Sequence, residues 1–350
     1  MRRFSPLAAL LLGALAFPVT VLAHPITEAD KAATIELLAK RLEVNYIIPE
    51  ASQKMADALR SHLSKGDYAK AGTHEEFAKL LKTHLQATHK DKHLGIRYMA
   101  EGAPEDRPSG QRKTPPEELA RMRSWGQTVN FGFEKMERLT GNVMYLKLRG
   151  FPDHDVAKET ISTMMNATAY ADALIVDLRQ NGGGDPHTVA HAISYLVGDK
   201  KEQLTSMYFR AENKTQEFWT NPAVPGPRLG AGKPVYILTS EKTFSAAEDF
   251  TYTLQSMKRA TVVGETTGGG AHPIAPFRIN SHMVAIIPVG KSINPITKSN
   301  WEGIGITPDV AVPADKALDK AHVLALKALL PAADKYNQEG MRKKLAELEG

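Results

Sequence analysis

Ser245, in the stretch TSEKTFSAAEDF over residues 239–250, is the residue whose type and position first indicate chemistry. Ser245 and Glu248, three residues apart, fit the capping box that opens a helix. The serine also follows an apolar run that is typical of a buried strand. At a helix N-terminus it lies in a positive field, which favours a nucleophile and the negative charge that it creates. Ser245 is therefore both a predicted helix cap and a candidate nucleophile.

A glycine triplet in DLRQNGGGD, residues 177–185, also follows a predicted buried strand. Glycines let the backbone approach a ligand closely and leave N–H groups exposed. The segment lacks both the Lys-Ser/Thr pair of a P-loop and the G-x-G-x-x-G pattern, so a phosphate loop is not favoured. Two interpretations stay open: a tight strand-to-helix turn, and an oxyanion hole for a scissile carbonyl.

A serine hydroxyl needs a base before it can attack a carbonyl. Neither G-x-S-x-G nor S-x-x-K surrounds Ser245, so the base must come from elsewhere in the fold. His187 and His191 lie four apart on a predicted helix, a spacing that can hold zinc, but no third ligand is obvious and a surface helix is favoured. His272 follows glycines near a strand end and could serve binding. His93, in THKDKHLGIRY, is typical of a solvated histidine when judged by spacing alone.

Two kinds of secondary structure must position these residues. Residues 27–89 repeat apolar side chains at three- and four-residue spacing and predict about three helices. From about residue 125 onward, predicted strands alternate with helices, which indicates βαβ units and a largely parallel sheet. Reactive groups gather at the carboxyl ends of strands in such sheets. Both the glycine triplet and Ser245 are expected there.

The elements of this α/β region follow from composition and period. A hairpin is expected around Thr140-Gly141-Asn142. The remaining strands are expected at ALIVDLR (173–179), PVYILTS (234–240), ATVVGE (260–265) and MVAIIPVG (283–290). The helices are expected at 156–171, 186–197, 245–257 and 315–330.

Length and composition indicate an ordinary globular protein. The chain has 350 residues, 42% hydrophobic and 24% charged, which suits one large domain with an appendage, or two domains. It contains no cysteine. A thiol nucleophile, disulfides, thiolate metal sites and a lipidated cysteine are therefore excluded.

Residues 1–23 are typical of a cleaved secretory signal peptide. Arg2 and Arg3 precede an apolar stretch over residues 7–17, and cleavage is expected after Ala23. Pro18 interrupts a run that is already too short for a comfortable membrane anchor. Cleavage lowers the formal net charge from +5 to +3, which gives no reason to propose a nucleic-acid partner. The mature protein is expected to be periplasmic or secreted, with no integral membrane segment.

Five ordered segments resemble the tail-specific, or carboxyl-terminal processing, protease family. Its pattern runs through a D-x-H-like segment, a D-L-R-x-N-x-G-G turn, a serine followed by A-x-E, and two glycine-containing segments. The matching stretches here are DKHLG at 91, DLRQNGGG at 177, SAAEDF at 245, VVGETTGGG at 262 and WEGIGITPD at 301. Ordered matches over about two thirds of the mature chain are more specific than any single motif.

The resemblance implies a function and a set of site residues. The processing branch carries a base lysine in the glycine segment, but this chain has only glycines between Thr267 and Ala271, which excludes a Ser-Lys dyad. The tricorn-like branch uses Ser, His and Glu instead. The matching positions are Ser245 as nucleophile, His93 as base and Glu302 as the orienting carboxylate. The oxyanion donors would be the amide of Ala246 and that of Gly182 or Gly183.

The resemblance also implies a fold and an organisation into domains. The fold is an α/β, crotonase/ClpP-like core of βαβ units with an N-terminal helical module. The expected division is a signal peptide (1–23), a helical module (24–100), a Pro-rich charged linker (101–124), a catalytic domain (125–335) and a helical tail (336–350). The stretch 94–140 is too short for the PDZ module that processing proteases usually insert there.

The expected activity is that of an exported serine-type peptidase without a cofactor, acting on peptides or unfolded proteins. An alternative is a non-catalytic module for apolar ligands, because the glycine segment also resembles that of interphotoreceptor retinoid-binding protein. A metal-dependent hydrolase using His187 and His191 is a third, weaker hypothesis.

Overall fold

A computed structural model describes residues 24–106 and 114–350 of the chain. The signal peptide predicted over residues 1–23 lies outside the described residues. None of the helices in the described part of the chain has the length and apolar character needed to span a bilayer.

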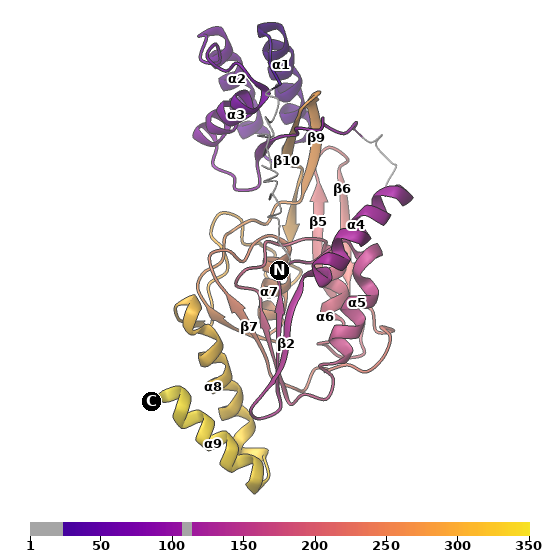
Figure 1. The fold of residues 1–350 in the computed structure, drawn as a ribbon, viewed down its shortest axis with the longest axis vertical. Helices are drawn as coiled ribbons and strands as arrows, with labels where there is room; N and C mark the ends of the chain where they lie inside the picture. The colour runs from indigo at the N-terminus through magenta and orange to yellow at the C-terminus, as the bar shows by residue number, and fades with distance from the viewer. Residues whose placement is uncertain (1–23, 107–113) are drawn as a thin grey trace, which may run out of the picture.

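Three helices form the N-terminal module (Figure 1), as the apolar spacing predicts; they are α1 (Glu28–Asn45), α2 (Pro49–Ser64) and α3 (His74–Thr88). A capping box closes the start of α3: Thr73 Oγ1 accepts from the Glu76 N–H, and Glu76 Oε2 accepts from the Thr73 N–H. Closing these otherwise unpaired donors starts the helix at a defined residue.

A small antiparallel sheet lies against this module. It has the order β1-β10-β9, with β1 (Gly95–Tyr98), β9 (Ile274–Asn280) and β10 (Met283–Pro288). Leu38, Leu81 and Ala285 belong to the apolar cluster between helices and sheet. The run MVAIIPVG therefore pairs with β1 and β9 rather than adding a strand to the parallel sheet. Because β1 and β9 both run antiparallel to β10, their N-terminal ends lie at the same end of the small sheet.

The central sheet has six strands in the order β12-β8-β7-β4-β3-β2. Five run parallel: β3 (Val143–Leu148), β4 (Ala173–Asp177), β7 (Val235–Thr239), β8 (Thr261–Gly264) and β12 (Val310–Ala311). β2 (Phe133–Leu139) pairs antiparallel with β3 and forms the predicted hairpin. The predicted α/β fold with βαβ units and an N-terminal helical module is confirmed.

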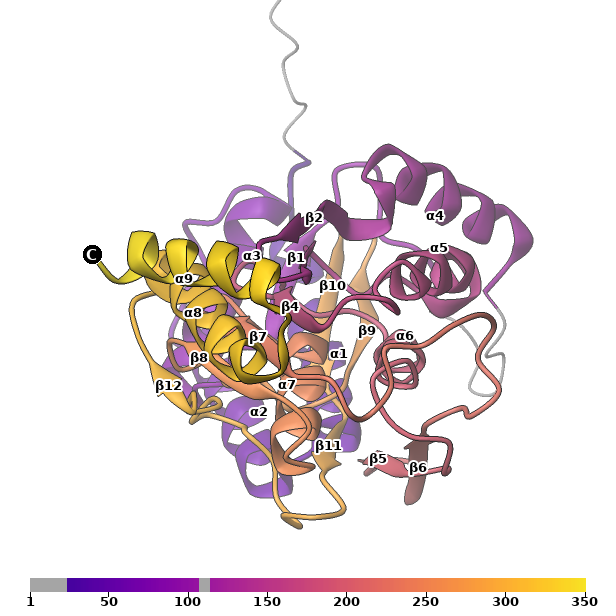
Figure 2. The ribbon, with the colours of Figure 1, turned by 90° about the horizontal axis from the view of Figure 1, so that it is seen from below.

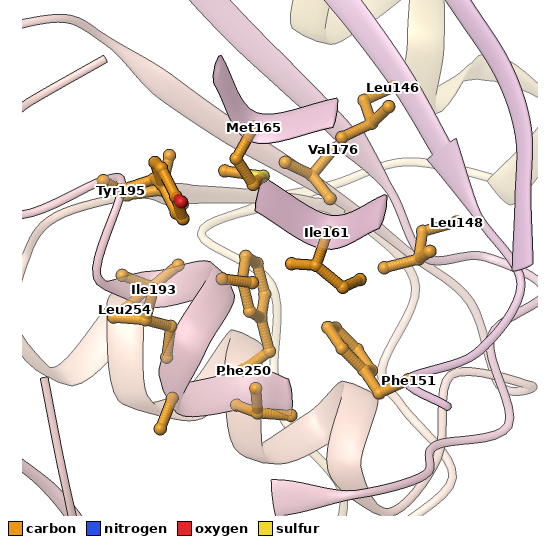
Figure 3. Packing of buried hydrophobic residues seen from close by; sticks show 14 of the residues in the cluster. Leu146, Leu148, Phe151, Ile161, Met165, Val176, Ile193, Tyr195, Phe250 and Leu254 are labelled. Atoms are coloured by element: carbon orange, nitrogen blue, oxygen red, sulfur yellow. The ribbon is translucent and has the colours of Figure 1, made fainter. Parts of the chain in front are cut away.

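Helices cover both faces of this sheet (Figure 2), with α5 (His154–Asn166), α6 (Pro186–Ile193) and α7 (Ala246–Ser256) against one face and α8 (Ala317–Leu329) against the other. Figure 3 shows Ile161 of α5 and Phe250 of α7 packed with Val176 of β4. All five residues of β4 and of β7 are buried, as expected for parallel strands covered on both faces.

A third sheet, antiparallel with the order β11-β5-β6, lies beside α6; its strands are β5 (Gln203–Phe209), β6 (Lys214–Trp219) and β11 (Gly290–Ile293). Three short 3-10 helices are η1 (Asn130–Gly132), η2 (Ala314–Lys316) and η3 (Leu330–Ala332). Within the predicted linker, 101–124, helix α4 (Pro116–Thr128) begins, and the predicted tail, 336–350, lies in α9 (Lys335–Glu349) and at Gly350. The domain boundaries stay predictions.

Candidate active site

Ser245 stands between the end of β7 and the start of α7, at the carboxyl edge of the central sheet. Its backbone has φ 55° and ψ −121°, a region that side chains other than glycine seldom adopt. Such a conformation costs about 1–3 kcal/mol and persists only where surrounding contacts impose it. A strained strand-to-helix turn is also what presents the serine in nucleophile elbows. The backbone therefore favours a reactive role for Ser245 over a purely structural one.

Glu248 ties this turn to the glycine segment that follows β8. Its Oε2 accepts from the Ser245 N–H at 2.8 Å and from the Gly270 N–H at 2.9 Å. Its Oε1 accepts from the Thr267 hydroxyl at 2.5 Å and from the Gly269 N–H at 2.7 Å. Glu248 is fully buried, and this burial raises the pKa of its carboxyl although the four donors favour the charged form. The carboxylate half of the capping box is thus a clamp that positions two segments at once.

Asn181 holds the glycine triplet against Ser245. The buried Asn181 Oδ1 accepts from the Gly183 N–H at 2.9 Å, and its carbonyl oxygen accepts from the Phe244 N–H at 3.0 Å. A Cβ on Gly183, which has φ +107°, would lie 2.7 Å from the Ser245 Cβ. Only glycine fits a position with that backbone and that clearance.

The three predicted oxyanion donors are not equally available. The Gly183 N–H already donates to Asn181, so it is occupied in this structure. Gly182 is exposed, and its N–H donates to no acceptor within residues 24–106 and 114–350. Ala246 is the first residue of α7, and its N–H likewise has no acceptor in that part of the chain. Of the three predicted donors, those of Ala246 and Gly182 are therefore free within the described residues.

His93 lies two residues before β1, and its ring packs against Phe244, the neighbour of Ser245, with ring centroids 4.6 Å apart. The His93 N–H donates to Asp91 Oδ1 at 2.9 Å, which fixes the backbone there. Its Nδ1 is buried and has no hydrogen-bond partner among the described residues. No hydrogen bond joins the His93 ring to the Ser245 hydroxyl in the same part of the chain. His93 and Ser245 therefore lie in the same region of the structure, but their side chains are not hydrogen-bonded there.

Burial lowers the pKa of His93 to about 4, although the carboxylate of Asp91 acts in the opposite direction. The imidazole is then neutral at ordinary pH, which is the protonation state that a general base requires. If His93 is the base, kcat/KM for an uncharged peptide should hold as pH falls through 6.5 and decline only near pH 4. Steady-state rates from pH 3.5 to 8 measure this acid side of the pH–rate profile. A decline centred near pH 6.5 would assign the acid side of the profile to a group other than His93.

Gly270 faces the same histidine. A Cβ at this position would lie 2.3 Å from Phe244 Cζ and 2.7 Å from His93 Cε1. The ring of His93 thus fills space that a side chain at 270 would need. We expect Gly270→Ala to displace both rings and lower kcat/KM by about 100-fold, the order of loss that a 1 Å misplacement brings.

Gly232→Ala is the matched control, because no atom of the described residues lies within 4 Å of its added Cβ. Both variants are compared by peptide hydrolysis and by thermal unfolding. Full activity in Gly270→Ala would show that the position of His93 does not matter for the reaction.

Glu302 lies beside His272 and not beside His93, the histidine expected to be its partner. Its Oε2 accepts from the Ala271 N–H at 2.6 Å and from the His272 N–H at 3.1 Å. The same oxygen is 3.6 Å from His272 Nδ1, and Asp91 Oδ2 is 3.5 Å from that nitrogen. No hydrogen bond joins Glu302 to His93 among the described residues. The sequence carried no signal for this grouping except that His93 and His272 each precede a strand by two residues.

The grouping of Asp91, His272 and Glu302 is the one that could hold a metal ion in the described part of the chain. One ligand atom from each lies within 4.8 Å of the others. If His272 is protonated, its ring forms ion pairs with the same two carboxylates, those of Asp91 and Glu302. His187 and His191 do not converge on one point: His187 Nε2 lies 3.3 Å from Gln216 Nε2, and His191 Nε2 lies 2.8 Å from Ser162 Oγ. The two histidines whose spacing could hold zinc therefore contact two different side chains.

An open cavity of about 280 Å³ lies next to Ser245. Ser245, Gly270 and His272 line it together, whereas His93 lies behind Gly270 and Phe244. Its apolar walls come from β5, β6, the start of β9 and the loop after β11, and include Met207, Phe209, Phe218, Pro273, Ile274 and Trp301. A serine at the rim of a small, mostly apolar cavity is the arrangement expected of a site that binds one side chain of a substrate.

Two family comparisons cover most of the described chain. Residues 142–312 match Peptidase family S41, and residues 26–133 match the N-terminal domain of peptidase S41 in eukaryotic IRBP. The chain belongs to peptidase family S41. The S41 match contains the glycine triplet, Ser245, the glycine segment and Glu302, and the N-terminal match contains His93.

Relatives of this S41 chain include a carboxyl-terminal-processing protease of a Picosynechococcus species, 28% identical over 190 residues, and one of Bartonella bacilliformis, 30% identical over 188 residues. The matches cover 53% and 50% of this chain but only 43% and 40% of those proteins. The chain therefore spans less than half the length of these relatives. A solved lipoprotein of Streptococcus agalactiae shares the fold, with a TM-score of 0.57 and 14% identity over 85% of this chain and 96% of its own.

Proposed function

We propose that this chain is an exported serine peptidase that hydrolyses peptide bonds, with Ser245 as nucleophile, His93 as general base and Glu302 as the carboxylate. One observation carries the proposal: Ser245 is held at positive φ at the start of α7, beside the Ala246 N–H, which has no acceptor among the described residues. Membership of peptidase family S41 supports the same reading. A merely structural cap would not need the strained backbone.

The proposed reaction follows from these positions. The Ser245 hydroxyl attacks the scissile carbonyl while the neutral His93 ring takes its proton. Negative charge on the carbonyl oxygen is stabilised by the N–H groups of Ala246 and Gly182 and by the N-terminus of α7. His93 then returns the proton to the leaving amine, and water releases the acyl group.

Glu302 acts in this proposal by stabilising the imidazolium of His93. That role requires its carboxylate, or a group that it holds, to meet the buried and unpartnered Nδ1 of His93. Glu302 already holds the backbone of Ala271 and His272, next to Gly270. In this proposal the segment rearranges when substrate binds, so that Glu302 or a group that it holds reaches His93.

The proposed substrates are peptides or unfolded proteins. The relatives are processing proteases by name. Among the described residues of the stretch 94–140, the helices and strands are β1, α4, η1 and β2. We infer that substrates enter the cavity beside Ser245 as extended segments rather than through a separate module for chain ends.

Covalent labelling tests the proposal. A fluorophosphonate reagent should modify the folded protein at Ser245, identified by peptide mass spectrometry, and the modification should be much slower in His93→Ala. His89→Ala, a change at another histidine outside the site, serves as the control. If the reagent leaves Ser245 untouched while an unfolded protein substrate stays intact, the peptidase assignment is wrong.

Export is proposed from the residue pattern of the first 23 positions. N-terminal sequencing of the protein recovered from the periplasm or the medium should begin at His24. Recovery of a chain that still starts at Met1 from the cytoplasm would count against it.

A second candidate function is the binding of apolar ligands without catalysis. Two observations favour it: the match of residues 26–133 to a domain of IRBP, and the apolar walls of the cavity. Organic extraction of the purified protein, followed by mass spectrometry, should then release a lipid-like molecule. A clean extract together with labelling of Ser245 would exclude a purely binding role.

A further inference from the structure

Helix α7 carries a second buried carboxylate that the proposed reaction does not use. Asp249 lies in the first turn of α7, four residues after Ser245, and both residues line the same cavity. Asp249 is only 3% exposed. Its Oδ1 has no hydrogen-bond partner, and no lysine or arginine forms an ion pair with it in the described part of the chain.

An unpaired carboxylate in such a place is costly. Burying a charge without a partner is unfavourable by several kcal/mol, so the group either takes up a proton or pairs with a cation. Burial raises the pKa of Asp249 to about 7, although the hydroxyls of Thr253 and Thr205 act in the opposite direction. The carboxyl is thus poised to ionise when a positive charge arrives.

The cavity beside Ser245 connects this carboxylate to the reaction. Asp249 and Ser245 both line it, together with the buried apolar side chains of Met207, Phe218 and Trp301. Its volume of about 280 Å³ is below the usual range for whole ligands, roughly 300–1,000 Å³, and suits a single side chain. Lysine and arginine match these surroundings, because each has an apolar stem and a cationic end.

We propose that Asp249 makes this cavity a pocket for a lysine or arginine side chain, so that the enzyme cleaves peptides next to a basic residue. The inference rests on the proposed peptidase function and adds a substrate class to it. The stem of the basic residue packs against the apolar walls, and its cationic end pairs with the Asp249 carboxylate. A buried acid at the base of a pocket selects basic residues in this way in trypsin.

Peptide kinetics test the pocket. Two fluorogenic peptides are compared that differ only in lysine or leucine before the cleaved bond. We expect kcat/KM to favour the lysine peptide by at least tenfold, and Asp249→Asn, which keeps the shape of the side chain, to lower that ratio at least tenfold. Asp319→Asn, an exposed position on α8 across the sheet, is the control and should leave the ratio unchanged.

Ligand binding tests the proposed pocket without any need for peptide hydrolysis. In Ser245→Ala, calorimetry should detect binding of benzamidine, and the uncharged benzamide should bind at least tenfold more weakly. Labelling of Ser245 together with a preference for leucine would overturn the pocket but leave the peptidase standing. Failure of labelling would overturn the peptidase function. The binding measurement would still test the pocket for a basic side chain, because equal affinity for benzamidine and benzamide would overturn it.

Discussion

Ser245→Ala is expected to reduce peptide hydrolysis by about a million-fold, the order of loss seen when the nucleophile of a serine protease triad is removed. The change deletes the only atom that can form the acyl-enzyme, while the oxyanion donors of Ala246 and Gly182 stay in place. Both serine and alanine carry a Cβ, so the strained backbone at φ 55° is the same in the two proteins. Thermal unfolding should therefore change little.

The measurement is kcat/KM on a fluorogenic peptide beside a thermal unfolding curve. Ser281→Ala, an exposed serine in the turn between β9 and β10, is the matched control and should retain full activity. Hydrolysis that survives in Ser245→Ala at more than about a hundredth of the parent rate would point to another nucleophile or to a contaminating protease.

Glu248→Ala is expected to destabilise the fold by at least about 3 kcal/mol, since each buried donor that loses its partner costs about 1–3 kcal/mol. Three such donors would be left: the Thr267 hydroxyl and the N–H groups of Gly269 and Gly270. The glycine segment would also lose its connection to Ser245, so labelling of Ser245 should slow well below the unfolding temperature.

Glu248→Gln removes the negative charge of the side chain but keeps its shape, so it tests the two contributions separately. Its carbonyl oxygen can keep two of the four donors, whereas its amide group faces the other two as a donor itself. We expect about half the loss of Glu248→Ala, measured by urea unfolding, and intermediate labelling of Ser245. Equal stability of all three proteins would mean that Glu248 is not the clamp between the two segments.

Local signals in the sequence were sufficient for the secondary structure around the site. The apolar spacing of residues 27–89 predicted three helices, and the buried runs before the glycine triplet and before Ser245 predicted β4 and β7. These predictions succeed because helix and strand periods, caps and turn glycines act over a few residues. The α/β fold then follows from the alternation of elements.

The tertiary structure decided what those elements bring together. MVAIIPVG pairs with β1, which puts the loop of His93 beside that of His272 and lets Asp91 and Glu302 approach the second ring rather than the first. Asn181 takes the N–H of Gly183.

The burial of Asp249 in the lining of the cavity was likewise beyond prediction, since its sequence neighbours are those of an ordinary helix N-terminus. The residues of SAAEDF by themselves marked Ser245 as a cap that could also react. Which charges, donors and walls surround it depends on contacts between segments far apart in the chain. Those contacts are set by how whole faces of helices and sheets pack, and short-range patterns carry no record of that packing.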